Sequence, residues 1–260
     1  MRERSVGLGV MGFHSFLQQN MIPFESSMAK SWNFNIFKHI KKEVDRSSEA
    51  LAYERGPCPD AADYGMMERF SNKTAIAPTA SISTNCGGAS PGIEPIAGNS
   101  YNQKTLSGNF IVHNQALTKL LEEKGQNTDE VWTSITVNEG SVQHLDFLND
   151  DEKSVFKTAF ELDQRWVVEL AADRAKYISQ AQSVNIFLPA NVHKRDLHQI
   201  HFQAWKKGLK SLYYCRSKSI ARAEVVATGS TKKKALSEEQ LQLAAAANSS
   251  TDYEECLACQ

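Results

Sequence analysis

Short apolar segments with strand character alternate with long helical patterns over the first 214 residues. Strand candidates occupy residues 6–10, 74–77, 183–187 and 209–214. Parallel strands need crossover connections of a dozen or more residues, usually helical, whereas antiparallel strands are joined by tight turns. Strands separated by long helices therefore predict a parallel or mixed α/β fold rather than a β-sandwich. The glycines at positions 7 and 9 of the first candidate indicate a close approach of another backbone.

The helical patterns differ in length and in how clearly they are bounded. The longest is opened by Ser26 or Ser27 and closed at Gly56-Pro57. Its apolar positions are Met28, Trp32, Ile36, Phe37, Ile40 and Val44. Further helices are predicted over residues 114–124, 129–137, 151–182 and 197–205, the last ending at Gly208.

The composition changes after residue 214. Residues 215–234 carry a net charge of +5 and residues 235–260 a net charge of −5, and neither half contains Trp or Phe. Such a segment cannot bury enough apolar area to offset the entropy lost on ordering. We therefore expect residues 1–214 to form the folded part and residues 215–260 a flexible tail. One short helix is expected within the tail, where Ser237 and Gln240 fit a capping box ahead of residues 241–247.

The net charge, the length of the apolar runs and the cysteine count limit which classes of protein this chain can belong to. The 260 residues have a formal net charge of −1, which gives no support for binding nucleic acid or a membrane surface through bulk charge. The longest apolar runs fall far short of the roughly 20 residues that span a bilayer, and no signal peptide is recognisable at Met1. Five cysteines, an odd number, favour a reducing, cytoplasmic setting.

Cys256 and Cys259 form a Cys-x-x-Cys pair close to the last residue. Two thiols at this spacing can close a disulfide, and the spacing usually lowers the pKa of one thiol. At the end of a flexible tail, the pair suits a dithiol that carries reducing equivalents to a buried site. Half of a zinc site and incidental cysteines are the alternatives, but Cys58, Cys86 and Cys215 offer no second pair for the four ligands of zinc.

A small hydroxyl-rich segment follows the second strand candidate. Residues 78–83 (Pro78, Thr79, Ala80, Ser81, Ile82 and Ser83) combine a proline near a helix start with hydroxyl side chains. Free N–H groups at such a helix start are suited to bind phosphate. The segment lacks the lysine of a P-loop, so the residues alone favour an ordinary capped helix start over a phosphate site.

Tyr213 and Tyr214 end the last strand candidate. Neighbours in a regular strand point to opposite faces, which would separate the two phenols. If the chain leaves strand geometry here, the rings can stack and pass an electron. The seven histidines show no paired ligand spacing beyond His198 and His201, and we expect no metal site.

Taken together, these motifs resemble a known family. The chain contains, in order, residues 4–12 (RSVGLGVMG), residues 77–81 (APTAS) with 92–95 (GIEP), residues 208–214 (GLKSLYY) and the terminal Cys-x-x-Cys. This set is similar to the C-terminal part of the large (alpha) subunit of class I ribonucleotide reductase, and the likeness runs over essentially the whole chain.

The resemblance implies the C-terminal half of a ten-stranded α/β barrel followed by the flexible tail. It also implies that residues 78–83 hold the diphosphate of a ribonucleoside diphosphate substrate. Tyr213 and Tyr214 would relay a radical from a separate beta (small) subunit, which carries the metal-radical cofactor, so that this chain binds no cofactor itself. Cys256 and Cys259 would reduce the active-site disulfide and be reduced in turn by thioredoxin or glutaredoxin.

The resemblance also implies parts that this sequence lacks. The thiyl-radical cysteine, the substrate-reducing cysteine pair and the effector loops of the family lie upstream of residues 4–12. We therefore expect a chain that is inactive without a missing N-terminal half of the alpha subunit. A cobalamin-dependent class II reductase fragment is one alternative, although it has no use for a tyrosine pair. The other is a non-catalytic subunit that serves as a docking or redox-adaptor module.

Overall fold

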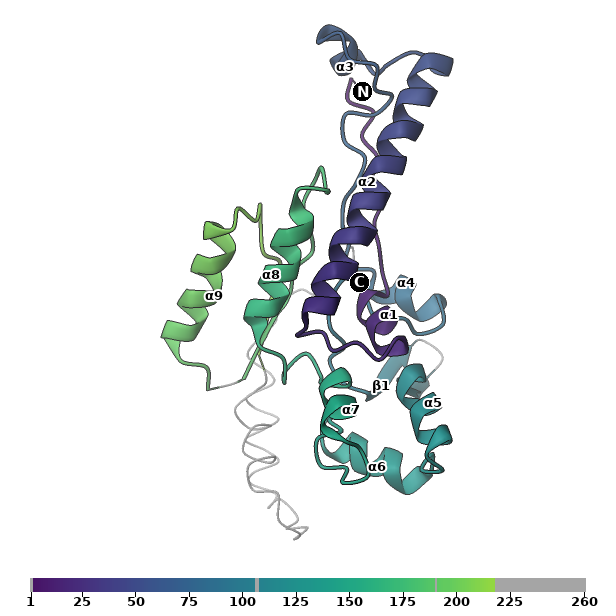
Figure 1. Cartoon of the computed structure of the whole chain (residues 1–260), viewed down its shortest axis with the longest axis vertical. Coiled ribbons are helices and arrows are strands. Elements are labelled where there is room, and N and C mark those ends of the chain that lie inside the picture. The colour runs from purple at the N-terminus through teal and green to yellow at the C-terminus, as the bar shows by residue number, and fades with distance from the viewer. Residues whose placement is uncertain (1, 106–107, 190, 218–260) are drawn as a thin grey trace. The chain divides into compact units, whose positions relative to one another are not determined.

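Four extended segments pair in parallel, in chain order, within the part of the chain that the structure describes. Leu8 bridges Thr74, and Ile76 bridges Gln182. The third segment continues into β3 (Ile186–Leu188), which pairs in parallel with β4 (Cys215–Ser217). Helices occupy the connections between the segments (Figure 1). The predicted α/β class with parallel pairing is confirmed.

The computed structural model describes residues 2–105, 108–189 and 191–217. Residues 1–218 cluster as one unit. The tail expected over residues 215–260 lies outside the described residues except for 215–217. Its short helix at 241–247 and its cysteines Cys256 and Cys259 fall in the undescribed part.

Close backbone packing at the first segment accounts for one of its glycines. A Cβ atom at Gly9 would lie 2.6 Å from the carbonyl oxygen of Ala75, closer than real side chains approach. Leu8 donates its N–H to Lys73 and accepts from the N–H of Ala75 in the same region. The close approach expected from the glycines is therefore found at Gly9.

Several helices in the described residues begin or end where the local sequence predicts a cap. They are α1 (Phe13–Gln19), α2 (Ser27–Arg55), α3 (Pro59–Asp63), α4 (Ala80–Asn85), α5 (Gln115–Glu123), α6 (Asp129–Val137), α7 (Asp150–Val155), α8 (Gln164–Ala175) and α9 (Lys194–Lys206). The side chain of Ser26 accepts the N–H of Ala29 and so begins α2, and Gly56, with φ of 81°, ends it. Helix α2 packs on α8, and α8 packs on α9 (Figure 1).

The single helix predicted over residues 151–182 is wrong. The structure has α7 and α8 there, separated by residues 156–163. The N–H of Thr158 donates to the carboxylate of Glu161, and the N–H of Ala159 donates to the carbonyl of Ile96. These two N–H groups therefore do not make the backbone hydrogen bonds of an α-helix. The side chain of Asp163 then caps the start of α8.

The buried face of α2 also differs from the predicted apolar positions. Its buried residues are Ala29, Asn33, Phe37, Ser48 and Ala52, whereas Met28 and Trp32 are 56% and 40% exposed. Besides Phe37, the side chains that α2 buries are therefore small or polar.

A β-hairpin was not predicted. Strand β1 (Ser100–Thr105) pairs antiparallel with β2 (Gly108–His113). Helices α5, α6 and α7 follow it and form their own apolar cluster around Trp132, Ile135 and Phe156. The hairpin gives the chain a mixed set of strand pairings.

The larger apolar cluster joins α1, α2, α8 and α9 to the parallel segments. At its centre the guanidinium of Arg174, 1% exposed, donates to the side-chain oxygens of Asn33 and Gln182. Burial lowers the pKa of Arg174 to about 9. Because its partners are neutral amides, this cation links α2, α8 and the third segment through hydrogen bonds rather than through a buried ion pair.

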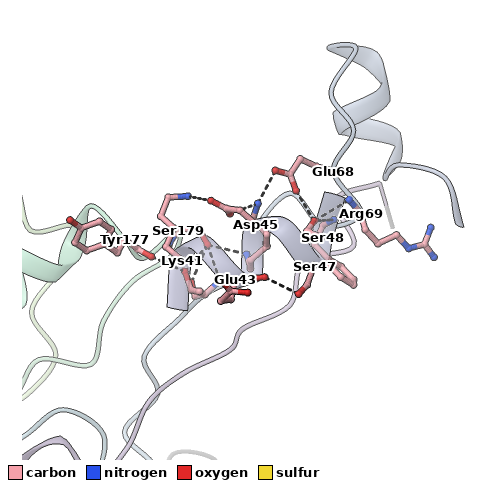
Figure 2. Close-up of polar contacts among 12 residues, drawn as sticks. Lys41, Glu43, Asp45, Ser47, Ser48, Glu68, Arg69, Tyr177 and Ser179 are labelled. Atoms are coloured by element: carbon pink, nitrogen blue, oxygen red, sulfur yellow. Dashed lines mark hydrogen bonds and ion pairs between the residues drawn. The ribbon is translucent and has the colours of Figure 1, made fainter. Parts of the chain in front are cut away.

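A polar network fastens α2 to the second segment (Figure 2). The Lys73 ammonium lies 2.7 Å from Asp45 and 2.9 Å from Glu68, and Lys41 also contacts Asp45 at 2.6 Å. Burial alone would raise the pKa of Asp45, but hydrogen bonds from Lys41 and Lys73 outweigh it and hold that pKa below its ordinary value. The side chain of Lys73 is only 11% exposed, whereas those of Asp45 and Glu68 are 36% and 24% exposed.

Replacing this lysine should destabilise the fold. Lys73→Met keeps the aliphatic stem but leaves Glu68 and one oxygen of Asp45 without their ammonium donor. We expect the free energy of unfolding to fall by about 2 kcal/mol, measured by urea denaturation. Lys42→Met, at an exposed position of the same helix, is the control and should change it by less than about 0.5 kcal/mol. Equal stabilities of the two variants would contradict this account of the network.

Candidate functional site

A pocket of about 740 Å³ lies where the parallel segments end. Ser15 of α1 and Ser83 of α4 line it, together with Glu94, Phe187 of β3 and Arg216 of β4. Helices α1 and α4 directly follow the first and second extended segments. The pocket therefore lies at the carboxyl edge of the parallel segments, which is where α/β proteins bind their ligands.

The start of α4 forms one wall of this pocket. Thr79, with φ of 53°, precedes the helix, and its hydroxyl accepts the N–H of Gly92 at 2.7 Å. The Ser83 hydroxyl donates to the carbonyl of Ala80 at 2.9 Å. The Ser83 N–H is the first to bond back within the helix, to Thr79, and the N–H groups before it belong to the helix end that can bind an anion.

Only some of the six residues predicted to bind substrate line the pocket. Ala80 and Ser83 line the pocket. Pro78, Thr79, Ser81 and Ile82 are not among its lining residues in the described structure, and Ile82 is 57% exposed.

Glu94 places a carboxyl group in the pocket wall. Its residue is 6% exposed, and burial raises the pKa of the carboxyl above its ordinary value. A hydrogen bond from Asn185, the charge of Arg216 and a hydrogen bond from Ser183 act in the opposite direction without cancelling the effect. The carboxyl group of Glu94 therefore has a higher pKa than that of an exposed glutamate.

His14 supports the loop that carries Glu94. Its Nδ1 accepts the N–H of Ile96 at 2.9 Å, and its ring meets Phe24 edge to face at 5.3 Å. His14 is completely buried, and its Nε2 finds no hydrogen-bond partner among the described residues. Burial lowers the pKa of His14 to about 3, so the imidazole is neutral in the folded protein at neutral pH.

The rings of Tyr213 and Tyr214 lie together, with centroids 4.1 Å apart and planes inclined by 53°. The regular strand predicted over residues 209–214 is wrong, because regular pairing begins at Cys215. The guanidinium carbon of Arg216 lies 5.7 Å from the centre of the Tyr214 ring. Since Arg216 also lines the pocket, it connects the tyrosine pair to it.

The structure also places the three remaining cysteines that the sequence analysis considered. Cys58 is buried, and Cys86 and Cys215 are exposed free thiols. Within the described ranges, no group of three His, Cys, Asp or Glu side chains is arranged to hold a metal ion. No helix there is long and apolar enough to cross a membrane.

The family model of the ribonucleotide reductase barrel domain matches residues 1–67 and 60–215. The chain belongs to the ribonucleotide reductase family. It is 47% identical over 231 residues to the ribonucleoside-diphosphate reductase large subunit of Invertebrate iridescent virus 6, a match over 87% of this chain and 24% of that protein. The corresponding subunit of Danio rerio is 34% identical over 84% of this chain and 31% of its own length.

A solved structure of a ribonucleotide reductase subunit is also similar to this chain. The alpha subunit of the Actinobacillus ureae class Id ribonucleotide reductase superposes with a TM-score of 0.78 and 42% identity, over 88% of this chain and 41% of that chain. The resemblance to the large subunit is thus confirmed. The chain spans about a quarter to two fifths of the length of these relatives.

For this reductase-family chain, sequence reasoning assigned no role to Glu94, Asn185 or Arg216. Glu94 stands in the 92–95 motif quoted above, and the sequence also held a signal for Asn185. In the third segment Ser183 and Asn185 alternate with Val184 and Ile186, and both polar residues are buried. Polar side chains two apart on one face of a strand point to a polar partner there.

His14 should make the stability of the fold depend on pH. The unfolded imidazole takes up a proton below about pH 6.5, whereas the folded one stays neutral down to about pH 3. Stability is therefore lost as pH falls, by about 2 kcal/mol between about pH 7 and about pH 5.

The measurement is the free energy of unfolding across this pH range. His14→Asn retains an acceptor for the N–H of Ile96 but does not titrate, so it should remove this share of the pH dependence. His39→Asn, at an exposed position of α2, should retain it. A His14→Asn variant with the original slope would show that His14 is not the group responsible.

Proposed function

We propose that this chain forms part of the catalytic barrel of a ribonucleoside-diphosphate reductase large subunit, the C-terminal half of a ten-stranded barrel. The enzyme reduces ribonucleoside diphosphates to deoxyribonucleoside diphosphates for DNA synthesis. The observation that carries the proposal is a tyrosine pair in ring contact beside a pocket at the carboxyl edge of the parallel segments. The large subunits named above are the relatives from which the activity is carried over.

The pocket is the proposed substrate site. Its volume of about 740 Å³ falls in the range of small-molecule sites. The start of α4 supports binding of the diphosphate by residues 78–83, with Ala80 and Ser83 facing the pocket. Arg216 adds a positive charge to the same wall, which favours an anionic substrate.

The tyrosine pair is the proposed radical relay. A phenol gives up one electron and one proton when it is oxidised, and rings in contact allow the electron to pass between them. Tyr213 and Tyr214 meet this condition, with ring centroids 4.1 Å apart. In this proposal the radical comes from a separate beta subunit, which holds the metal-radical cofactor.

Cys256 and Cys259 are the proposed reductants of the active-site disulfide. The support comes from the sequence: two thiols separated by two residues, near the end of a segment with separated charges. Thioredoxin or glutaredoxin would reduce the pair in a cytoplasmic setting.

Activity is proposed to require the rest of the large subunit, because this chain spans only part of the length of its relatives. The test combines this chain with a polypeptide that supplies the remaining barrel and with a beta subunit, and measures reduction of a ribonucleoside diphosphate. Turnover that depends on adenosylcobalamin instead of the beta subunit would favour a class II enzyme. Binding without turnover would favour a docking or redox-adaptor module.

In that reconstituted enzyme, Tyr213→Phe or Tyr214→Phe should reduce turnover to background. Phenylalanine keeps the ring and nearly the same volume, so stability should change little, but it removes the oxidisable phenol. Tyr53→Phe, at a residue 69% exposed on α2, is the matched control and should leave the rate unchanged. Near-normal rates in either pair variant would return the tyrosines to a packing role.

Cys256→Ser should abolish multiple turnover with thioredoxin, because the tail could no longer form its disulfide. A small dithiol that reaches the barrel directly should still support turnover of the same variant, which controls for damage to the site itself. The rate of diphosphate reduction with each reductant is the measurement. Full thioredoxin-dependent turnover in the variant would refute the role of this cysteine.

A further inference from the structure

The backbone hydrogen bonds around the tyrosine pair depart from those of a regular parallel ladder. In the register set by Ile186 opposite Cys215, a single residue, Tyr214, would donate to the carbonyl of Val184 and accept from the N–H of Ile186. Instead, Tyr213 donates to Val184 at 2.9 Å, and Tyr214 accepts from Ile186 at 2.9 Å. Two residues therefore share the bonding of one, which is the defining property of a β-bulge.

The bulge explains why neighbouring tyrosines touch. In a regular strand their side chains would point to opposite faces. With an extra residue inserted at this point, both rings come to the same side, with centroids 4.1 Å apart. Ring contact in the pair thus depends on the bulge being held.

A bulge leaves one N–H outside the ladder, and here the N–H of Tyr214 is that group. It donates to the side-chain Oδ1 of Asn185 at 2.9 Å. Asn185 lies in the neighbouring segment and is 1% exposed, so water cannot readily replace its amide. Tyr214 itself is 46% exposed, so the buried amide of Asn185 is the group that anchors the extra residue at this point.

The orientation of the Asn185 amide is itself fixed. Its oxygen faces the N–H of Tyr214, and its side chain lies close enough to the carboxyl of Glu94 to act against the rise that burial causes in the pKa of that group. Only the amide NH₂ can donate to a carboxylate. Ser183 donates to the carboxyl of Glu94 at 3.5 Å, and the NH₂ group is the part of the Asn185 amide that can face that carboxyl.

We propose that Asn185 is a positioning residue for the tyrosine pair: its amide oxygen holds the bulge that brings Tyr213 and Tyr214 into ring contact, and Glu94 fixes that amide. This role rests on the proposed function of the pair as a radical relay. Asn185 touches neither substrate nor the phenol oxygens in this scheme, and acts through the backbone of Tyr214.

The first test measures the ring contact directly, without turnover. Near-UV circular dichroism of the chain, minus that of its Tyr213→Phe variant, reports the coupled pair. In an Asn185→Leu background the same difference should collapse to the signal of an isolated tyrosine. Asn33→Leu, which removes a buried asparagine that accepts from Arg174 and not from the tyrosine pair, is the control and should preserve the coupled signal. An undiminished signal in Asn185→Leu overturns the proposal.

The second test uses the reconstituted reductase. Asn185→Leu should lower kcat at least about tenfold while leaving the KM for the diphosphate unchanged. The double variant Asn185→Asp with Glu94→Gln exchanges the two functional groups. The new carboxylate can accept from the N–H of Tyr214, and the new amide can donate to that carboxylate. It should recover the coupled signal, and failure of that signal to recover overturns the proposal even if Asn185→Leu folds poorly.

The two tests separate this proposal from the proposed function. Loss of the coupled signal with unchanged kcat would support the positioning by Asn185 and refute the relay role of the pair. Loss of kcat with an intact coupled signal would overturn the positioning role and leave the relay in place.

Discussion

Parallel pairing of short extended segments is the constraint on which the rest of this structure depends. Parallel neighbours cannot be joined by tight turns, so each connection must cross over and carries helices with it. Helices α2 and α8 lie in two of these connections and pack against each other. The same constraint puts the carboxyl ends of the segments at one edge, where α1, α4 and the Glu94 loop meet around the pocket. The fold and the location of the site thus have a common cause.

The features that sequence reasoning predicted correctly depend on neighbouring residues. Ser26 and Gly56 bound α2 because a hydroxyl cap and a positive φ are local properties. Helix α6 begins at Asp129 because Thr128 caps it. The parallel architecture followed from the alternation of strand and helix patterns, which is also a property of chain order.

The errors arise where distant residues override local preference. Helical periodicity continues through residues 156–163, but Glu161 and Ile96 take N–H groups there that a helix would need. The tyrosine pair shows the same effect in a strand. Alternation of side chains predicts separated rings, and the bulge that joins them depends on Asn185, which lies on another segment. No local pattern around Tyr213 and Tyr214 encodes that partner.

Glu94 belongs both to the pocket and to the support of the tyrosine pair. It lines the cavity, and the Asn185 side chain acts against the effect of burial on the pKa of its carboxyl group. Arg216 shows the same dual placement, since it lines the cavity and lies over the ring of Tyr214. An anionic ligand in the pocket would interact with both charges, attracting Arg216 and opposing ionisation of Glu94.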